Sequence, residues 1–299
     1  MPRLPTTLMR LTPLQDTFAH EVLDLSLWKD LDETTLNGLR TAWRRHGVLV
    51  FRRQSLSETE LVRFFSHFGT SEIIVRTDWQ SLNQDEVIHI SNMKDASGRS
   101  IGGLGSGELD WHSDQSYMTA PATGALLYMV EMPNEGGTTY WANLQQAYDA
   151  LSEETRSQIA HLEAIYDYAK RQSTYDDEAP LSSALRVKTP PVLHPLVCVN
   201  PQTHRKSLYI DPTTMVGISG ASTEEGAALL AHLSAHATQP CFVYAHHWQV
   251  GDVVMWDNGQ VLHRRDRFDE TTPRWLKRLT CRLSPEHHLV PASRPYIGT

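Results

Sequence analysis

The stretch Gly107-Glu-Leu-Asp-Trp-His-Ser-Asp-Gln-Ser-Tyr117 places a histidine and an aspartate two positions apart, His112 and Asp114. If this segment is extended, side chains two positions apart project to the same side, so an imidazole nitrogen and a carboxylate oxygen would reach one point. That pair would supply two ligands of a metal ion. About one His-x-Asp is expected by chance in a chain of this length, so the tripeptide needs support from the rest of the sequence.

A third ligand must come from elsewhere in the chain. The best placed histidine is His263, in the stretch Trp256-Asp-Asn-Gly-Gln-Val-Leu-His-Arg-Arg265. Two histidines and one carboxylate on one face of an octahedral Fe(II) leave three positions open, which suits an iron that holds a bidentate cosubstrate and O2 together. We therefore predict that His112, Asp114 and His263 bind Fe(II) and form the catalytic centre.

The composition indicates one large domain with a small-molecule partner. The chain has 299 residues, of which 40% are hydrophobic and 21% charged, so it can bury a full core. Its formal net charge of -8 argues against a nucleic-acid or anionic-membrane surface. Without a membrane-length apolar run or a signal core, we expect a cytoplasmic protein, with a homo-oligomer as one option. Cys198, Cys241 and Cys281 form no Cys-x-x-Cys pair, and we expect buried, reduced thiols.

Short apolar strands alternate with a few amphipathic helices along the chain. Capping residues followed by apolar positions three and four apart predict helices over residues 32–47, 57–69, 143–151, 152–162 and 223–237. Apolar or alternating runs predict strands over residues 48–51, 87–92, 124–130, 138–141, 192–199, 206–210, 241–245, 252–256 and 275–283, with edge strands within 8–27. Because a short turn separates 124–130 from 138–141, we expect a hairpin beside the metal.

This alternation predicts a mainly β fold with helical decoration around a double-stranded β-helix, the cupin-like jelly roll. We expect a single domain over residues 1–299, with its core at about 8–285. Two segments have the composition of loops, the polar stretch 173–183 and the segment 96–107 with its five glycines. The glycine-rich segment directly precedes the metal tripeptide, and it is either a lid that closes over a substrate or a plain mobile surface connection.

Several landmarks occur in one order along the chain. They are Trp111-His-Ser-Asp114, Gly136-Gly-Thr-Thr-Tyr-Trp141, His194-Pro-Leu-Val197, Gly251-Asp252 leading to Trp256-Asp-Asn258, and His263 followed by Arg274 and Arg278. In these landmarks the chain resembles the TauD/TfdA-type Fe(II)- and 2-oxoglutarate-dependent dioxygenases, from Leu11-Thr-Pro-Leu14 to about Leu283. Together the landmarks are specific in a way that the tripeptide alone is not.

The resemblance implies the same iron ligands and adds roles for further residues. It implies Arg274 as the partner of the distal 2-oxoglutarate carboxylate, with Thr139 hydrogen-bonding the same group. A bidentate guanidinium also suits a carboxylate buried beside a metal better than a lysine would. Arg278 shares a strand face with Arg274 and matches a second family arginine near cosubstrate and substrate, although a structural ion pair is an alternative role. The side chains expected near the substrate are Asn92, Leu104, Gln115, Trp256 and Arg278.

The implied reaction oxidises an unactivated C–H bond of a small organic substrate, most simply by hydroxylation, with release of succinate and CO2. Desaturation, epoxidation and loss of a hydroxylated leaving group stay open. Residues 70–110, where relatives place substrate contacts, do not follow the taurine enzyme, so taurine is not the inferred substrate.

Two other interpretations stay open at this point. One is a non-redox enzyme in which zinc, held by the same three residues, activates water. It leaves Arg274 and Thr139 unexplained. The other is a catalytically silent small-molecule binding protein on the same fold, against which the intact ligand set argues.

Overall fold

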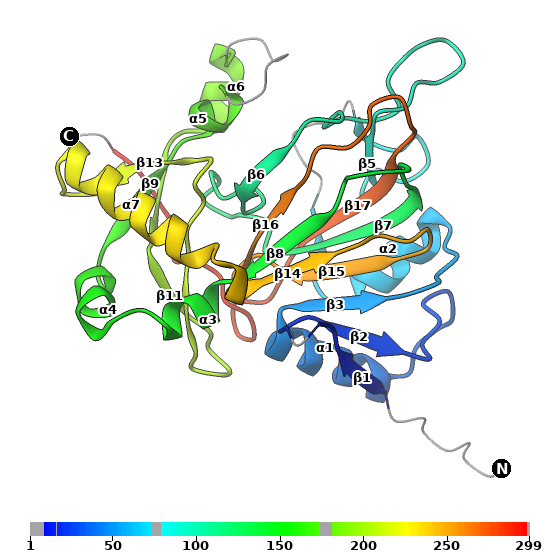
Figure 1. Cartoon of the computed structure of the whole chain (residues 1–299), viewed down its shortest axis with the longest axis horizontal. Coiled ribbons are helices and arrows are strands. Elements are labelled where there is room, and N and C mark those ends of the chain that lie inside the picture. Colours follow the sequence, from blue (N-terminus) through cyan, green and yellow to red (C-terminus); the bar gives the residue numbers. More distant parts are fainter. Residues whose placement is uncertain (1–8, 16, 73–78, 174–180, 298–299) are drawn as a thin grey trace.

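The structure is a computed structural model that describes residues 9–15, 17–72, 79–173 and 181–297 (Figure 1). Two sheets face each other at its centre. The described strands of the larger sheet are, in spatial order, β1 (Arg10–Pro13), β2 (His20–Leu23), β3 (Val48–Phe51), β15 (Val253–Asp257), β7 (Gly124–Glu131), β17 (Trp275–Arg282) and β4 (Thr70–Ser71), while β5 (Ile88–Ser91) also pairs with β17. Those of the smaller sheet are β14 (Val243–His246), β8 (Thr139–Asn143), β16 (Val261–Arg265) and β6 (Leu109–His112).

The central strand β15 is buried on both faces, which explains its unbroken apolar sequence. Val254 and Trp256 point into the core between the two sheets, where the rings of Trp256 and Trp141 of β8 lie 5.6 Å apart. Val253 and Met255 point the other way, into the core beneath the N-terminal helices. Two sheets closed over a shared core in this way form the expected jelly roll.

The helices α1 (Glu33–His46) and α2 (Glu58–Ser66) cover the outer face of the larger sheet (Figure 1). Asp32 caps α1 by accepting a hydrogen bond from the Thr35 N–H at 2.7 Å, and α2 begins with a capping box between Ser57 and Glu60. Phe64 and Phe65 of α2 are buried against α1 and the sheet, on the apolar face of this helix. Each such ring contributes about 1.5–3 kcal/mol through burial.

The outer face of the smaller sheet carries the remaining elements, seen together on the left of Figure 1. Ala142 of β8 and Leu262 of β16 project into the core between this sheet and these elements. The elements are α3 (Leu144–Asp149), α4 (Glu153–Ile159), β9 (Glu163–Tyr166), α5 (Tyr168–Gln172), α6 (Ser183–Lys188), β10 (Val192–Pro195), β11 (Val197–Val199), β12 (Lys206–Leu208), β13 (Met215–Ile218), α7 (Thr223–Ala237), the 3-10 helix η2 (Pro240–Phe242) and β18 (Arg294–Pro295). Each described helix is too short or too polar to span a membrane.

Several expectations about the elements are wrong. The segments 124–130 and 138–141 do not form a hairpin, because β7 belongs to the larger sheet and β8 to the smaller one. The run 192–199 divides into β10 and β11, which pair with different strands. Cys241 is exposed, whereas Cys198 and Cys281 are buried free thiols as expected. Most of the polar stretch 173–183 lies outside the described residues.

Candidate metal centre and cosubstrate pocket

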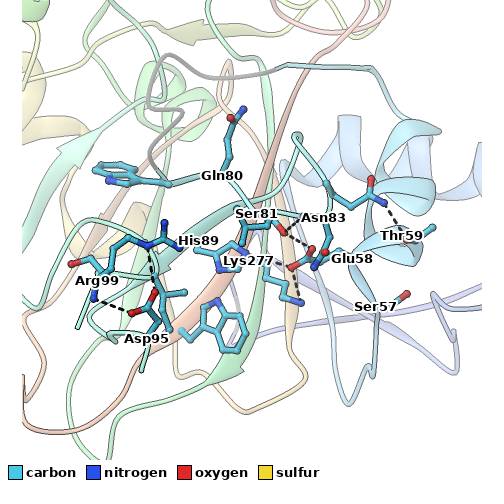
Figure 2. A pocket seen from close by; sticks show the side chains of 17 residues that line it. Ser57, Glu58, Thr59, Gln80, Ser81, Asn83, His89, Asp95, Arg99 and Lys277 are labelled. Carbon is cyan, nitrogen blue, oxygen red and sulfur yellow. Dashed lines mark hydrogen bonds and ion pairs between the residues drawn. The ribbon is translucent and has the colours of Figure 1, made fainter. Parts of the chain in front are cut away.

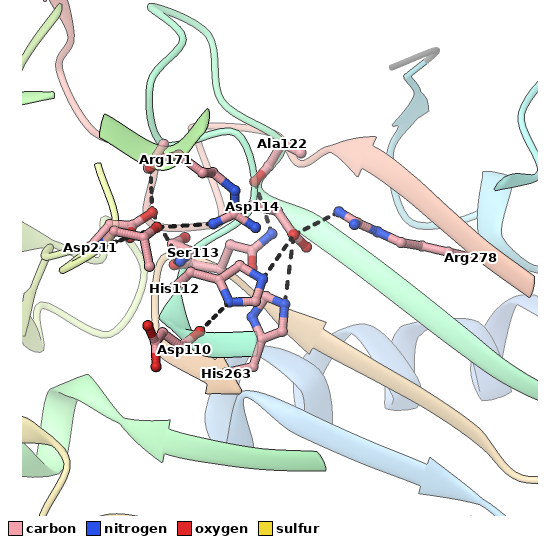
Figure 3. Close-up of polar contacts among 12 residues, drawn as sticks. Asp110, His112, Ser113, Asp114, Ala122, Arg171, Asp211, His263 and Arg278 are labelled. Carbon is pink, nitrogen blue, oxygen red and sulfur yellow. Dashed lines mark hydrogen bonds and ion pairs between the residues drawn. The ribbon is translucent and has the colours of Figure 1, made fainter. Parts of the chain in front are cut away.

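The two histidines of the centre come from neighbouring strands. β6 and β16 pair antiparallel, and their register sets His263 directly opposite His112, with ring centroids 4.0 Å apart. The Asp114 carboxylate lies beside both, its Oδ1 at 3.6 Å from His263 Nε2 and 4.0 Å from His112 Nε2. One ligand atom from each residue lies within 4.8 Å of the others, and all three residues are buried. The structure thus brings the predicted ligand set together, as Figure 3 shows.

Asp114 reaches this point by a route that differs from the expected one. β6 ends at His112, and the chain then turns, so the two side chains do not share the face of one strand. Gln115 has a φ of 53°, in the left-handed region that non-glycine residues rarely adopt. The ligand turn, residues 113–116, therefore directs the carboxylate to the imidazoles.

The protonation states of the three side chains suit a divalent metal ion. Burial lowers the pKa of His263 to about 4 and that of His112 well below its usual value, so both imidazoles are neutral near pH 7. His112 donates from Nδ1 to the Asp110 carbonyl at 2.7 Å, which leaves the lone pair of Nε2 facing the centre.

Asp114 supplies the negative charge. Burial favours its neutral form, but the cations around it, Arg278 first, prevail and lower its pKa. Its Oδ2 is buried and has no hydrogen-bond partner in the described structure. An ionised, incompletely paired carboxylate beside two neutral imidazoles is a donor set that fits Fe(II).

Two predicted cosubstrate residues, Arg274 and Thr139, line a pocket that includes the predicted metal ligands His112 and His263. Arg274 is 2% exposed, its Nε has no hydrogen-bond partner, and among the described residues no carboxylate pairs with it. Burial, together with the charge of Arg265, lowers the pKa of the Arg274 guanidinium well below its ordinary value. A buried cation of this kind is costly unless an anion joins it, so the pocket fits a ligand carboxylate.

The hydroxyl of Thr139 is oriented by a residue that the sequence did not reveal. The indole N–H of Trp248 donates to Thr139 Oγ1 at 2.9 Å. Because an indole N–H only donates, the Thr139 hydroxyl is the acceptor in this bond. Its own proton can therefore be donated to an acceptor in the pocket.

Some of the other predicted residues line the pocket and others do not. Arg278 and Trp256 line the pocket, and Arg278 also pairs with Asp114 through Nη2 and Oδ1 at 2.7 Å. Leu104 lines it too, from the glycine-rich segment. Asn92 instead accepts from the Arg274 N–H at 2.9 Å and donates to the Thr272 carbonyl at 2.9 Å, so it fixes the start of β17. The Gln115 amide faces Glu72, 3.2 Å from its carboxylate.

Two charged residues near the centre were not predicted, because no local pattern marks them. The charge of Arg171, on α5, acts on His112, Asp114 and His263 alike. Figure 3 shows Arg171 and Asp211 on one side of the ligands and Arg278 on the other. Arg171 donates to the Thr213 hydroxyl at 2.9 Å.

The glycine-rich segment is tied to its neighbours at several points. Gly103 accepts from the Ser91 N–H at 3.1 Å and donates to the His89 carbonyl at 3.2 Å. A Cβ at Gly102 would stand 2.3 Å from the His89 carbonyl oxygen, so only glycine fits there. The carbonyls of Leu104 and Gly107 accept from Arg265. Around Gly102 and Gly103 the segment therefore pairs with β5 in the manner of an edge strand.

A separate cavity of about 1310 Å³ lies on the opposite face of β5 and β17 (Figure 2). There the Glu58 carboxylate lies 3.1 Å from the Lys277 ammonium and 3.4 Å from the His89 ring. Arg274, directly before β17, and Arg278 on it face the metal pocket, whereas Trp275 and Lys277 face this outer cavity. The strand is therefore a shared wall between two cavities.

A jelly roll that brings two histidines and a carboxylate together beside a buried arginine defines the class of 2-oxoglutarate-dependent non-haem iron oxygenases. The model of the family described as "Taurine catabolism dioxygenase TauD, TfdA family" matches residues 10–280, and the chain belongs to this family.

Curated relatives and solved structures agree with this assignment. The chain is 35% identical over 286 residues to the alpha-ketoglutarate-dependent 2,4-dichlorophenoxyacetate dioxygenase of Burkholderia sp. (strain RASC), covering 91% of this chain and 95% of the relative. It is 29% identical over 266 residues to pentalenolactone F synthase of Streptomyces avermitilis, covering 83% and 86%. The crystal structure of AAD-2 in complex with Mn(II) and N-oxalylglycine is 32% identical with a TM-score of 0.79, covering 92% and 98%. The protein is thus an Fe(II)- and 2-oxoglutarate-dependent dioxygenase, and the non-redox and silent alternatives are not favoured.

Proposed function

We propose that the protein oxidises a C–H bond of a small organic acid, with hydroxylation as the simplest outcome. The observation that carries this proposal is the buried set of His112, Asp114 and His263 next to a buried arginine, Arg274, that lacks a carboxylate partner among the described residues. The set fits the iron, and the arginine fits the distal carboxylate of 2-oxoglutarate. When bound, Fe(II) supplies the activation of O2 that oxidative decarboxylation of 2-oxoglutarate requires.

Each residue of the pocket has a distinct part in this proposal. The metal would be held by His112, Asp114 and His263, which would leave coordination positions for the cosubstrate and O2. The Arg274 guanidinium would bind the cosubstrate carboxylate through its N–H groups, and the Thr139 hydroxyl would donate to the same carboxylate. The apolar walls, which include Trp256 and Leu104, exclude water from the reacting groups.

The acidic substrate class is supported by a cation in the wall of the pocket, Arg278. Arg278 lines the pocket, and Asp114, the carboxylate that it pairs with, would also bind the metal ion. An anionic substrate would meet Arg278 while its C–H bond approaches the iron. Relatives named for 2,4-dichlorophenoxyacetate, (S)-phenoxypropionate and sulfate esters act on anions, which supports the same class for this chain.

Other features of the proposal rest on the sequence. We keep the proposals of a single domain over residues 1–299, a cytoplasmic location, and a small molecule as the partner in place of nucleic acid or membrane. The segment 96–107 would act as a lid only in its outer part, since Gly102 and Gly103 are held against β5. Among oxidative outcomes, loss of a hydroxylated leaving group is the second candidate, since sulfate ester dioxygenase is a relative.

The test measures succinate formed from 2-oxoglutarate in air with ferrous iron. The panel compares aryloxyacetates, 2-aryloxypropionates and alkyl sulfates with their uncharged methyl ester or alcohol counterparts, and taurine serves as the zwitterionic comparison. We expect stimulation by at least one anion and none by its uncharged counterpart. Equal stimulation by an acid and its ester would contradict the proposed anion site while leaving the oxygenase assignment intact.

A further inference from the structure

A buried acid that is remote in sequence holds the ligand turn. Asp211 lies between β12 and β13 and has no exposed surface. Its Oδ2 accepts from the Ser113 N–H at 3.2 Å and from the Ser116 hydroxyl at 2.5 Å. Its Oδ1 accepts from the N–H and the hydroxyl of Thr213, at 2.9 and 2.7 Å. The carboxylate thus binds the residue before Asp114 and a residue shortly after it.

The turn needs such support because the sheet does not provide it. The ladder that registers His112 with His263 ends at His112, so it does not fix Asp114. The left-handed Gln115 adds strain on the order of 1–3 kcal/mol, which persists only where surrounding contacts hold it. Asp211 supplies contacts on both sides of this strained position.

A second clamp comes from the same part of the fold. His194 of β10 donates from Nε2 to the Ser116 carbonyl at 2.6 Å, and its Nδ1 accepts from the Ser293 hydroxyl at 2.7 Å. Because a carbonyl only accepts, Nε2 must carry the proton. Two residues from the elements outside the smaller sheet therefore bind Ser116. His194 binds its carbonyl, and Asp211 binds its hydroxyl.

We propose that Asp211 is a positioning residue that sets the place of Asp114 and thereby the affinity of the centre for its metal ion. It contacts no predicted metal ligand with its carboxylate and acts through the turn. Residues that orient the ligands of a metal typically change its affinity by about 10- to 100-fold when they are removed. The proposal rests on the assignment of Asp114 as a metal ligand.

The experiment measures Mn(II) binding to the purified full chain with 2-oxoglutarate present and O2 excluded, so no turnover is required. We expect Asp211→Ala to raise the Kd for Mn(II) about 10- to 100-fold. Asp211→Asn should have a smaller effect, since the amide oxygen can still accept from Ser113 or Ser116. A Kd for Asp211→Ala within twofold of the unchanged protein would overturn the proposal.

Two further variants keep the outcome interpretable. Asp252→Asn is the matched control for Asp211→Asn, because Asp252 is also fully buried and accepts from the Gln249 N–H at 2.9 Å, but it does not contact the ligand turn. We expect its Kd for Mn(II) to stay unchanged. If Asp211→Ala does not fold, Ser116→Ala tests the proposal in its place. We expect Ser116→Ala to raise the Kd for Mn(II) several-fold. An unchanged Kd would contradict the proposal. Tight Mn(II) binding by Asp114→Ala would instead refute the ligand assignment itself.

Discussion

Replacing Arg274 with lysine should weaken 2-oxoglutarate binding much more than it slows catalysis. The guanidinium can offer two N–H groups to one carboxylate, whereas an ammonium meets it as a single point charge. A hydrogen bond to a charged group contributes about 1.5–3 kcal/mol, so the loss of one should raise the KM for 2-oxoglutarate by about 10- to 100-fold. The Thr139 hydroxyl still marks the position of the distal carboxylate, and kcat should therefore change little.

The assay follows succinate formation at increasing 2-oxoglutarate concentration with saturating Fe(II). Arg282→Lys is the matched control, because Arg282 ends the strand that Arg274 precedes but is solvent-exposed and pairs with Glu72 at 2.7 Å. Its KM for 2-oxoglutarate should equal that of the unchanged protein. An unaltered KM in Arg274→Lys, with only substrate affinity reduced, would refute the cosubstrate role and assign Arg274 to the substrate.

Three further predictions address the ligands, the glycine segment and pH. Asp114→Ala should abolish both bound iron and turnover, as measured by metal analysis and succinate formation; retained iron would show that another residue supplies the ligand. Gly102→Ala should lower the melting temperature by about 2–10 °C, because a Cβ there overpacks against the His89 carbonyl, whereas Gly107→Ala, with open space around it, should not. Burial lowers the pKa of His194 from 6.5 to about 4, so the unfolded chain takes up a proton first and the free energy of unfolding should fall as pH drops through that range. Urea unfolding at about pH 7.5 and about pH 5 tests this, and His194→Gln should show a smaller fall.

The sequence was sufficient to select three residues that the structure brings together, His112, Asp114 and His263, but not for the way in which they converge. The side-chain types of histidine and aspartate indicate metal ligands whatever the backbone conformation. The expected strand geometry, although wrong after His112, selected the same residues. In the structure a turn after His112 presents Asp114. Such a turn has no clear sequence signal, because glutamine rarely takes the left-handed conformation of Gln115.

Long-range contacts account for what the sequence could not predict. Apolar alternation correctly located β7 and β8, but it carries no information about which sheet a strand joins, and the hairpin was therefore wrong. Asp211 and Trp248 act on Ser116 and Thr139 across large separations in the chain. Their roles depend on which segments pack together, and a single sequence does not show that.

The direct register between His112 and His263 makes a bound metal ion a cross-link between the first half of the chain and its last strands. A slip of one residue in that pairing would turn His263 away from the interior and leave the ion without a ligand. The metal would therefore stabilise only the correctly paired barrel. An ion that binds the folded state alone adds about 2.7 kcal/mol at a free concentration one hundred times its Kd. Iron supply should thus raise the free energy of unfolding as well as support activity.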